Sequence, residues 1–510
     1  MVDSPSVNEQ APRPVPLTAF EKRFKHPPGL VVLFFAEMWE RFSYYGMRGL
    51  LKLYVANYLF VNWRQIKQGQ PFSSGSPIDV LGGSFIRSLL STPSDASLSV
   101  CLGKAVKNYP ALDPAAALDA ARQACIAQEH ASILYGWYTG LVYLTPFFGG
   151  ILADRFLGQR KTVLVGGVLM ALGHFVMASE QAFFIALGLL ILGNGAFKPN
   201  VSTQVGGLYA AGDPRRDGAY TIYYMGINLG AFICNFVCGT LAVIYGWHYG
   251  FAAAGVGMVI GLTVYVFGQR YLATDNLTLH KDDTTTKQPL DAGEWKRVWA
   301  LIALCALNIV FWAVYEQQGN TMQTWADEQT VWPVIGGFQL PSTWFQSVNP
   351  MCIVLLAPLL DMFWQRQAKR GTEPSSVSKM AIGCIILGLS FIVMVIGAQV
   401  VGSGKGSLFW PVFCTLLLTV GELYLSPIGL SLVTKVSPVR IVSMMMGMWF
   451  CSSFLGNTLS GYIGVLYTRL PKEAFFLLLT VLGVGAGLAM WAFNKPLRRA
   501  IGSSAEKAAG

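Results

Sequence analysis

Charge is scarce in this chain of 510 residues. Asp, Glu, Lys and Arg together make up 13% of it, against about 25% in a typical soluble globular domain. The mean hydropathy is +0.46. A soluble fold of this length needs more charge on its surface. The composition therefore argues against a soluble enzyme and indicates a protein that crosses the membrane many times.

Signatures of catalysis and of metal binding are also missing. The five His residues are scattered, and the nine Cys residues contain no zinc or redox CxxC spacing. There is no P-loop, HExxH or GxSxG motif. A membrane enzyme or a receptor is therefore the least favoured class, and we predict no metal site and no cofactor other than protons as a coupling ion.

Long apolar runs dominate what is present. We count twelve runs of roughly membrane-crossing length, ~20 residues each, at approximately 30–58, 132–154, 161–179, 182–206, 218–240, 247–268, 298–319, 346–365, 377–400, 408–432, 441–467 and 474–494. The fold class that follows is an all-α membrane protein with 12 transmembrane helices, surrounded by the lipid bilayer.

The distribution of positive charge sets the expected orientation. Lys and Arg concentrate in the two terminal segments and in the even-numbered connections, and the short odd connections carry almost none. The positive-inside rule then places both termini in the cytosol, as expected for a multi-pass protein of the inner (cytoplasmic) membrane. Read in this way, the net charge of +10 is a topology signal, and we see no nucleic-acid module.

Two long connections divide the chain. We predict a cytosolic tail at 1–28, a six-helix bundle at 29–268, a cytosolic linker at 269–296, a second six-helix bundle at 297–495 and a cytosolic tail at 496–510. Residues 59–131 form an insertion on the outside that reads as a hairpin of two amphipathic helices. Cys101 and Cys125 lie on its two arms, where they could form a disulfide or remain buried thiols.

The first apolar run contains an unusual stripe of charge. On a helix, Glu37, Glu40, Arg41, Tyr44 and Arg48 fall within about 100° of arc. From Glu37 to Arg48 the helix rises ~16 Å, half the hydrocarbon thickness. Ion pairing between helices would explain one Glu and one Arg, but hardly two of each. Charge inside the membrane usually marks function.

Three further charges stand alone in apolar runs: Lys198 beside Pro199, Glu316, and Glu422 ahead of Pro427. With the stripe they make four acids and three bases. Because unpaired charge in low dielectric is costly, the extra carboxyl group should be neutral part of the time, as a proton carrier requires. A zwitterion could bridge the two halves, its carboxylate held by Arg48 and Lys198 and its ammonium by Glu422.

Several aromatic residues accompany these charges. They are either core residues or the lining of a binding pocket, and they comprise Tyr44, Tyr45, Tyr143, Trp312 and Trp449.

These residues together resemble a known family. Glu37-x-x-Glu40-Arg41-Phe-Ser-Tyr44-Tyr45-Gly resembles the ExxER(F)xYYG motif of the proton-dependent oligopeptide transporter family. The segment from Tyr143 to Gly158 resembles its second-span signature, and the segment from Tyr223 to Gly230 resembles its fifth-span motif. Lys198, Glu316 and Glu422 match the charged positions of spans 4, 7 and 10.

The resemblance implies a major-facilitator fold, two six-helix bundles around a central site, that imports di- and tripeptides with protons. It implies proton coupling by Glu37, Glu40 and Arg41, with Glu316 added here as a carboxylate that could carry a proton. It implies gating by the pairs Arg48–Glu316 on the outer side and Lys198–Glu422 on the inner side. The implied peptide-binding positions, the termini first, are Arg48, Lys198, Asn228 and Glu422, then Tyr44, Tyr143, Asn349, Trp449 and Ser453.

Two departures and one alternative remain. The linker at 269–296 is too polar to form the two extra helices that many bacterial members carry, and the insertion at 59–131 is not part of the pattern. The alternative is a proton-coupled carrier of the same fold for another substrate, such as nitrate or peptide-like drugs. By analogy with the fold we expect a monomer.

Overall fold

The computed structural model describes residues 24–60, 113–210, 213, 215–273, 290–438 and 441–494. Twelve long helices occupy most of these ranges. Those of the first half are α2 (Pro28–Tyr54), α6 (Pro114–Leu152), α7 (Gln159–Val176), α8 (Phe183–Gly207), α9 (Arg215–Tyr245) and α10 (Trp247–Gly268). Those of the second half are α11 (Ala292–Tyr315), α13 (Val348–Lys369), α14 (Ser376–Val401), α15 (Phe409–Val436), α16 (Val442–Arg469) and α17 (Lys472–Ala492).

Short elements complete the fold. Two π-helical turns, η1 (Val55–Leu59) and η5 (Ala153–Leu157), extend α2 and α6, and the 3-10 turns η6 (Glu180–Ala182) and η7 (Gln269–Tyr271) flank α8 and α10. Between α11 and α13 the chain forms η8 (Glu316–Gln318), α12 (Thr321–Glu328), a hairpin of β1 (Val334–Ile335) and β2 (Phe338–Gln339), and η9 (Ser342–Ser347).

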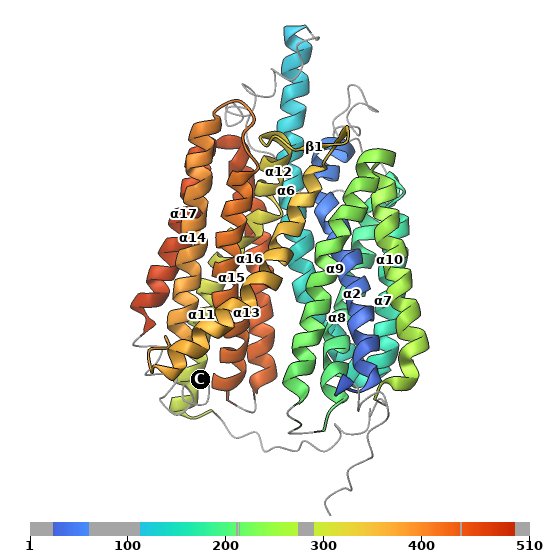
Figure 1. Cartoon of the computed structure of the whole chain (residues 1–510), viewed down its shortest axis with the longest axis vertical. Coiled ribbons are helices and arrows are strands. Elements are labelled where there is room, and N and C mark those ends of the chain that lie inside the picture. Colours follow the sequence, from blue (N-terminus) through green and yellow to red (C-terminus); the bar gives the residue numbers. More distant parts are fainter. Residues whose placement is uncertain are drawn as a thin grey trace, which may run out of the picture.

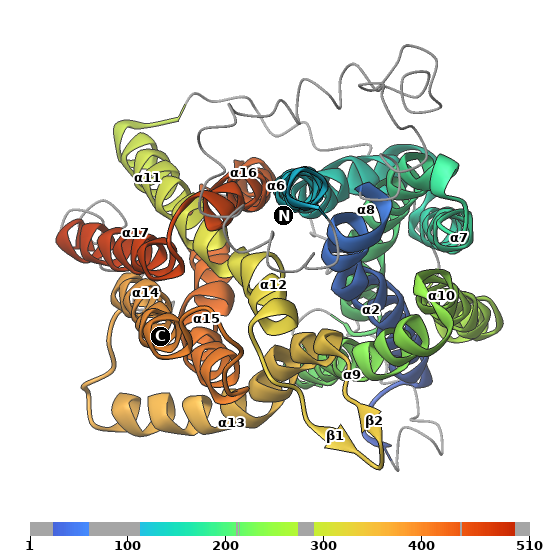
Figure 2. The ribbon, with the colours of Figure 1, turned by 90° about the horizontal axis from the view of Figure 1, so that it is seen from above.

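The helices form two bundles of six, as the sequence predicts (Figure 1, Figure 2). Each bundle has its own apolar core. One core draws its buried residues from Leu30 to Leu272, and the other from Val298 to Met490. The boundary between the two cores, from Leu272 to Val298, coincides with the polar segment that the sequence predicts as the linker.

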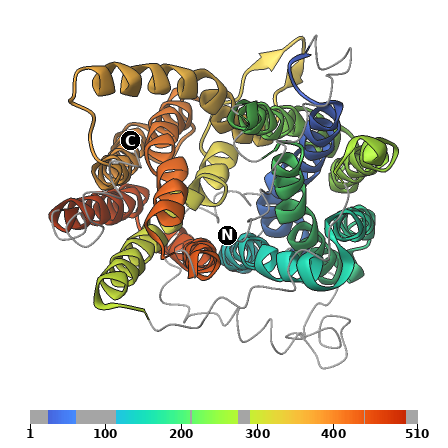
Figure 3. The same cartoon turned by 90° about the horizontal axis from the view of Figure 1, so that it is seen from below.

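Eight of these helical segments are long and apolar enough to cross a membrane by composition alone. The other four long helices are α2, α6, α7 and α16. Helix α2 carries the charged stripe, and α6 and α16 are rich in Tyr, Ser, Thr and Gly. Seen from below, the helices of each bundle lie side by side (Figure 3), and the charged stripe of α2 is buried against protein rather than exposed to lipid.

The second span differs from its predicted bounds. Helix α6 begins at Pro114 and runs without a break for 39 residues. Asp113 caps it by accepting hydrogen bonds from the backbone nitrogens of Ala115 and Ala116, both at 3.0 Å. The second arm of the predicted insertion is thus a continuation of the span, and its first arm lies outside the described residues. Cys125 is disulfide-bonded; Cys101 lies outside the described residues, so their pairing stays a prediction.

The two ends of the molecule differ in how the bundles meet. We call the end where α2 and α11 begin the linker end, and the opposite end, from which α6 projects, the far end (Figure 1). Hydrogen bonds join the two bundles in the far half, for example Asn235 Nδ2 to Ser347 Oγ at 3.2 Å and Trp137 Nε1 to Tyr462 Oη at 3.1 Å. The structure is therefore closed at the far end.

Close packing of α6 on α16 contributes to this closure. Gly136 and Gly461 face each other, and a Cβ atom built on Gly136 would come within 2.7 Å of the Gly461 backbone. Only glycine permits this approach, as is common where membrane helices cross closely.

Candidate transport site

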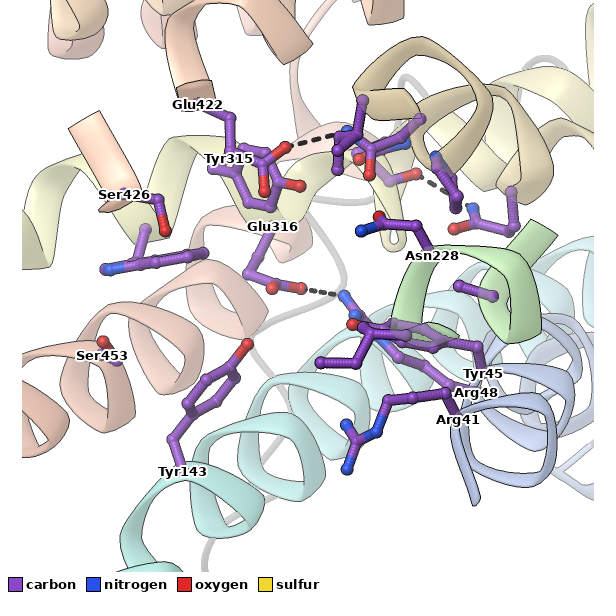
Figure 4. Close-up of a pocket in the computed structure, with 18 of the residues that line it drawn as sticks. Arg41, Tyr45, Arg48, Tyr143, Asn228, Tyr315, Glu316, Glu422, Ser426 and Ser453 are labelled. Carbon is purple, nitrogen blue, oxygen red and sulfur yellow. Dashed lines mark hydrogen bonds and ion pairs between the residues drawn. The ribbon is translucent and has the colours of Figure 1, made fainter. Parts of the chain in front are cut away.

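A cavity of about 290 Å³ lies between the two bundles (Figure 4). Its size is near the lower end of the range of ligand pockets, roughly 300–1,000 Å³. The structure brings most of the predicted site residues together in its lining: Glu37, Arg41, Tyr45, Arg48, Tyr143, Lys198 and Asn228 from the first bundle, and Trp312, Glu316, Asn349, Glu422, Trp449 and Ser453 from the second.

The charged stripe of α2 faces this cavity because the helix turns by 100° per residue. Arg41 lies between two carboxylates. Its Nε is 3.0 Å from Glu37 Oε1, and it also pairs with Glu40. Asn194 on α8 donates to Glu40 Oε1 at 3.0 Å. All three charged side chains are almost fully buried, so one guanidinium faces two carboxylates and leaves one negative charge to be balanced, as a site for a proton requires.

Arg48 and Glu316 form an ion pair across the two bundles (Figure 4). Arg48 also donates from Nε to the hydroxyl of Tyr135 at 2.8 Å. Glu316 is almost completely buried, at 1% exposed, and Arg48 is 15% exposed. The pair that the family resemblance implies for the outer gate is therefore formed in this structure.

Lys198 and Glu422 are not paired with each other. Lys198 Nζ lies 4.7 Å from the centre of the Tyr143 ring, and Glu422 accepts a hydrogen bond from Asn349 Nδ2 at 3.0 Å. Neither side chain forms an ion pair with any described residue. The cavity thus presents a cation on the first bundle and a carboxylate on the second, both open to a ligand.

Two predicted residues lie behind the cavity wall. Tyr44 is 4% exposed and does not line the cavity; its ring stacks on Tyr138 with the centroids 6.5 Å apart. Its neighbour Tyr45, which is also a predicted site residue, lines the cavity. The two predicted tyrosines point in different directions because one residue along a helix turns the side chain by 100°, and a role of Tyr44 in binding stays a prediction. Glu40 likewise sits behind the wall and reaches the cavity only through Arg41.

Sequence reasoning missed a group of amide side chains in the lining. Asn235, Gln318 and Gln346 contribute to the wall, and Gln346 Nε2 donates to Gln323 Oε1 at 2.8 Å. The polar run that begins at Glu316 could have indicated that Gln318 lines the cavity. Nothing in the sequence singles out Asn235 or Gln346, because a single amide in or beside an apolar run is common.

A second ion pair between the bundles was also missed. At the far end Glu129 on α6 binds Arg469 on α16, with Oε1 2.9 Å from Nε and Oε2 3.0 Å from Nη2. Thr468 donates to the same carboxylate at 2.8 Å. These residues are 340 positions apart and lie at the ends of apolar runs, where charge needs no special explanation.

Comparison with known sequences decides the family. A model of the POT family matches residues 160–278 and 278–478. The chain belongs to the POT family. Symport coupled to protons is the general property of this family, and its members are transporters rather than enzymes, so this chain is a multi-pass membrane transporter.

Several transporters of known sequence are similar to this chain over most of their length. An uncharacterised transporter of Bacillus subtilis, YclF, is 32% identical over 97% of this chain and 98% of its own length. The peptide transporter YePEPT of Yersinia enterocolitica is 32% identical over 86% of this chain and 88% of its own. A di-/tripeptide transporter of Lactococcus lactis is 27% identical over 94% of this chain and 97% of its own.

Solved structures of POT transporters have the same fold. A mutant peptide transporter in complex with alafosfalin matches with a TM-score of 0.72 and 30% identity, over 94% of this chain and 96% of that one. A POT family transporter in complex with 5-aminolevulinic acid matches with a TM-score of 0.71 and 26% identity, over 93% and 97%. These matches confirm the predicted all-α major-facilitator fold, in which eight of the twelve long helices are candidate spans by composition.

Proposed function

We propose that this chain imports di- and tripeptides together with protons. The observation that carries the proposal is the central cavity, which offers an unpaired Lys198 on one bundle and an unpaired carboxylate, Glu422, on the other. A peptide is a zwitterion whose two charged ends match this arrangement. The relatives from Yersinia and Lactococcus are peptide transporters, which supports the same substrate class.

In this proposal the termini of the peptide bind to the two bundles separately. The carboxylate binds Lys198, and also Arg48 when Arg48 is released from Glu316. The ammonium binds Glu422, assisted by Asn228, whose Nδ2 already donates to the carbonyl of Tyr224 at 2.9 Å and leaves its oxygen as an acceptor. Trp312, Asn349, Trp449 and Ser453, with Tyr45 and Tyr143, form the walls for the side chains.

Protons would act at the carboxylates that face an arginine. In the Glu37–Arg41–Glu40 cluster a proton balances the excess negative charge. On Glu316 a proton would remove the charge that holds Arg48, and so weaken one bond that closes the far end. One proton contributes ~1.4 kcal/mol per pH unit and ~2.3 kcal/mol per 100 mV.

The orientation follows from the positive-inside rule, which places the linker end in the cytosol of the inner membrane. With the far end closed, the structure then represents a state shut toward the outside. Transport proceeds by rocking of the two bundles around the cavity, with Lys198 and Glu422 approaching each other when the inner side closes. We propose that one copy of the chain in the bilayer suffices.

Uptake of labelled dialanine into liposomes that contain only this protein tests the proposal. We expect accumulation when the inside is alkaline and negative, and its loss when an ionophore collapses the gradient. The control is Glu473→Gln, which removes a carboxylate from the first turn of α17, outside the cavity lining; it should transport as the parent does. Absence of uptake in folded protein would overturn the assignment of substrate.

Glu40→Gln tests the proton pathway separately. It should abolish accumulation driven by protons while counterflow of labelled peptide, which needs only the binding site and the rocking motion, continues. Equal loss of both activities would show that Glu40 serves folding or binding instead.

A second candidate is transport of other small molecules that carry both charges. It is favoured by the neighbour solved with 5-aminolevulinic acid, which bears an amine and a carboxylate as a peptide does. Competition against dialanine uptake separates the two, because a peptide carrier should prefer dialanine to 5-aminolevulinic acid. An inorganic anion such as nitrate engages no carboxylate, so its transport would survive Glu422→Gln.

A further inference from the structure

The hairpin of β1 and β2 is an apolar structure at the far end. Its register pairs Val334 with Gln339 and Ile335 with Phe338. Gly336 and Gly337 both have positive φ, 61° and 83°, which a tight two-residue turn requires and which favours glycine at both positions. The turn therefore places Ile335 and Phe338, the residues that flank it, at the tip of the hairpin.

The side chains on this hairpin are exposed and carry no charge. Val331, Val334 and Ile335 are 57%, 63% and 66% exposed, and no Asp, Glu, Lys or Arg occurs between Val331 and Leu340. A hairpin in water usually alternates apolar residues toward the core with polar residues outward. Contiguous exposed apolar side chains mark a surface that contacts something other than water.

The position of the hairpin indicates what its exposed apolar side chains contact. β1 and β2 lie at the rim of the molecule beside α13 and α9, and project sideways rather than over the far end (Figure 2). Helix α13 follows after η9, and its exposed surface at this end is apolar, with Met351, Val354 and Leu355 40%, 48% and 59% exposed. The hairpin and the membrane-spanning helix that follows η9 thus both expose apolar side chains at this end.

The backbone of the hairpin limits how deep it can lie. Its base is held by hydrogen bonds from Val331 N to Gly406 O and from Gly406 N to Gln329 O, both 2.8 Å, and by Trp332 Nε1 to the Ala326 carbonyl at 2.6 Å. Its strands are only two residues long, and strand pairing this short can satisfy only a few polar backbone groups. Backbone groups without a partner are not tolerated in hydrocarbon but are satisfied among lipid headgroups.

We propose that this hairpin inserts its apolar tip into the interfacial region of the lipid leaflet at the far end. The partner is the phospholipid bilayer, met from the side by Val334 and Ile335. This inference does not depend on the substrate of the transporter.

The hairpin is connected directly to the closed seam between the bundles. It leads into η9, where Ser347 Oγ donates to the Phe232 carbonyl at 2.7 Å and accepts from Asn235 Nδ2. A hairpin held by lipid therefore fixes one end of a segment that contacts the opposite bundle. The lipid composition of this leaflet can then influence the contact between the two bundles.

Nitroxide labels on Ile335→Cys and, separately, Val334→Cys test the proposal in liposomes. The readout is the ratio of collisions with oxygen, which concentrates in lipid, to collisions with a water-soluble nickel chelate. The matched control is Ser403→Cys, in the exposed α14–α15 loop at the same end. Protein without an added cysteine gives the background from native thiols.

We expect the ratio at both hairpin positions to exceed that of the Ser403 label several-fold. Ratios equal to that of the Ser403 label would place the hairpin in water and overturn the proposal. Low collision with both reagents would also overturn it, because a protein surface would then cover the tip. Labelling two positions keeps the result decisive if one variant does not fold, and size-exclusion chromatography identifies such a variant.

Discussion

The ion pair between Glu129 and Arg469 makes a sharp prediction about the far end. Glu129 is 2% exposed and receives three hydrogen bonds from α16, two of them from Arg469 and one from Thr468. Since α6 and α16 belong to different bundles, these bonds exist only while the far end is closed. Glu129→Gln should therefore shift the transporter toward states in which the far end is open.

The free-energy cost of Glu129→Gln depends on how exposed Arg469 is. Breaking a fully buried pair costs about 3–5 kcal/mol because the remaining charge is left without a partner. Arg469 is 21% exposed, so water can hydrate part of its guanidinium after the substitution, and the loss should be smaller. We expect about 1–2 kcal/mol, which changes the ratio of open to closed molecules roughly 5–30-fold.

Distances between spin labels on the two bundles measure this ratio. Leu118→Cys on the exposed end of α6 and Ser403→Cys on the α14–α15 loop place one label on each bundle at the far end. With Glu129→Gln a population at longer distance should grow. Glu473→Gln is the control, since it removes a carboxylate on α17 that has no partner in the other bundle. An unchanged distance distribution with Glu129→Gln would refute the reasoning.

Three further predictions concern the cavity, the packing and the disulfide. Glu422→Gln removes the charge from one bond to the ammonium of the substrate, about 1.5–3 kcal/mol, so competition assays should show ~10–150-fold weaker binding of dialanine and no such loss for N-acetyldialanine. A Cβ on Gly461 would lie 2.7 Å from the Ser132 carbonyl, so Gly461→Leu should keep the bundles apart at the far end and abolish uptake. The variant should still elute as one peak in size-exclusion chromatography. Normal uptake would contradict the packing argument. Alkylation should add the mass that corresponds to Cys125 only after reduction, and modification without reductant would exclude the disulfide.

Much of the fold was accessible from local features of the sequence. The twelve apolar runs correspond to twelve long helices, because hydropathy and helix length are properties of each segment alone. Local sequence features predicted the polar ends of helices less well. They placed the start of the second span at 132, whereas α6 starts at Pro114. They also did not predict α12 or the β1–β2 hairpin between the seventh and eighth spans.

The candidate site was accessible to the extent that charge in an apolar run is visible in the sequence. The stripe from Glu37 to Arg48 and the single residues Lys198, Glu316 and Glu422 stand out for this reason. Residues that support them could not be found in the same way. Tyr135 binds Arg48, and Asn194 binds Glu40, but a Tyr or an Asn in a membrane helix is ordinary.

The sequence by itself determined that this protein spans the membrane in two sets of helices and which charged groups lie inside them, because the cost of burying charge applies residue by residue. Only the tertiary structure decided which charges meet. Arg48 pairs with Glu316, 268 positions away, while Lys198 and Glu422 stay apart. Which charged residues pair depends on which ends of the bundles are in contact. The far ends are held together by the packing of Gly136 on Gly461 and by the ion pair of Glu129 with Arg469.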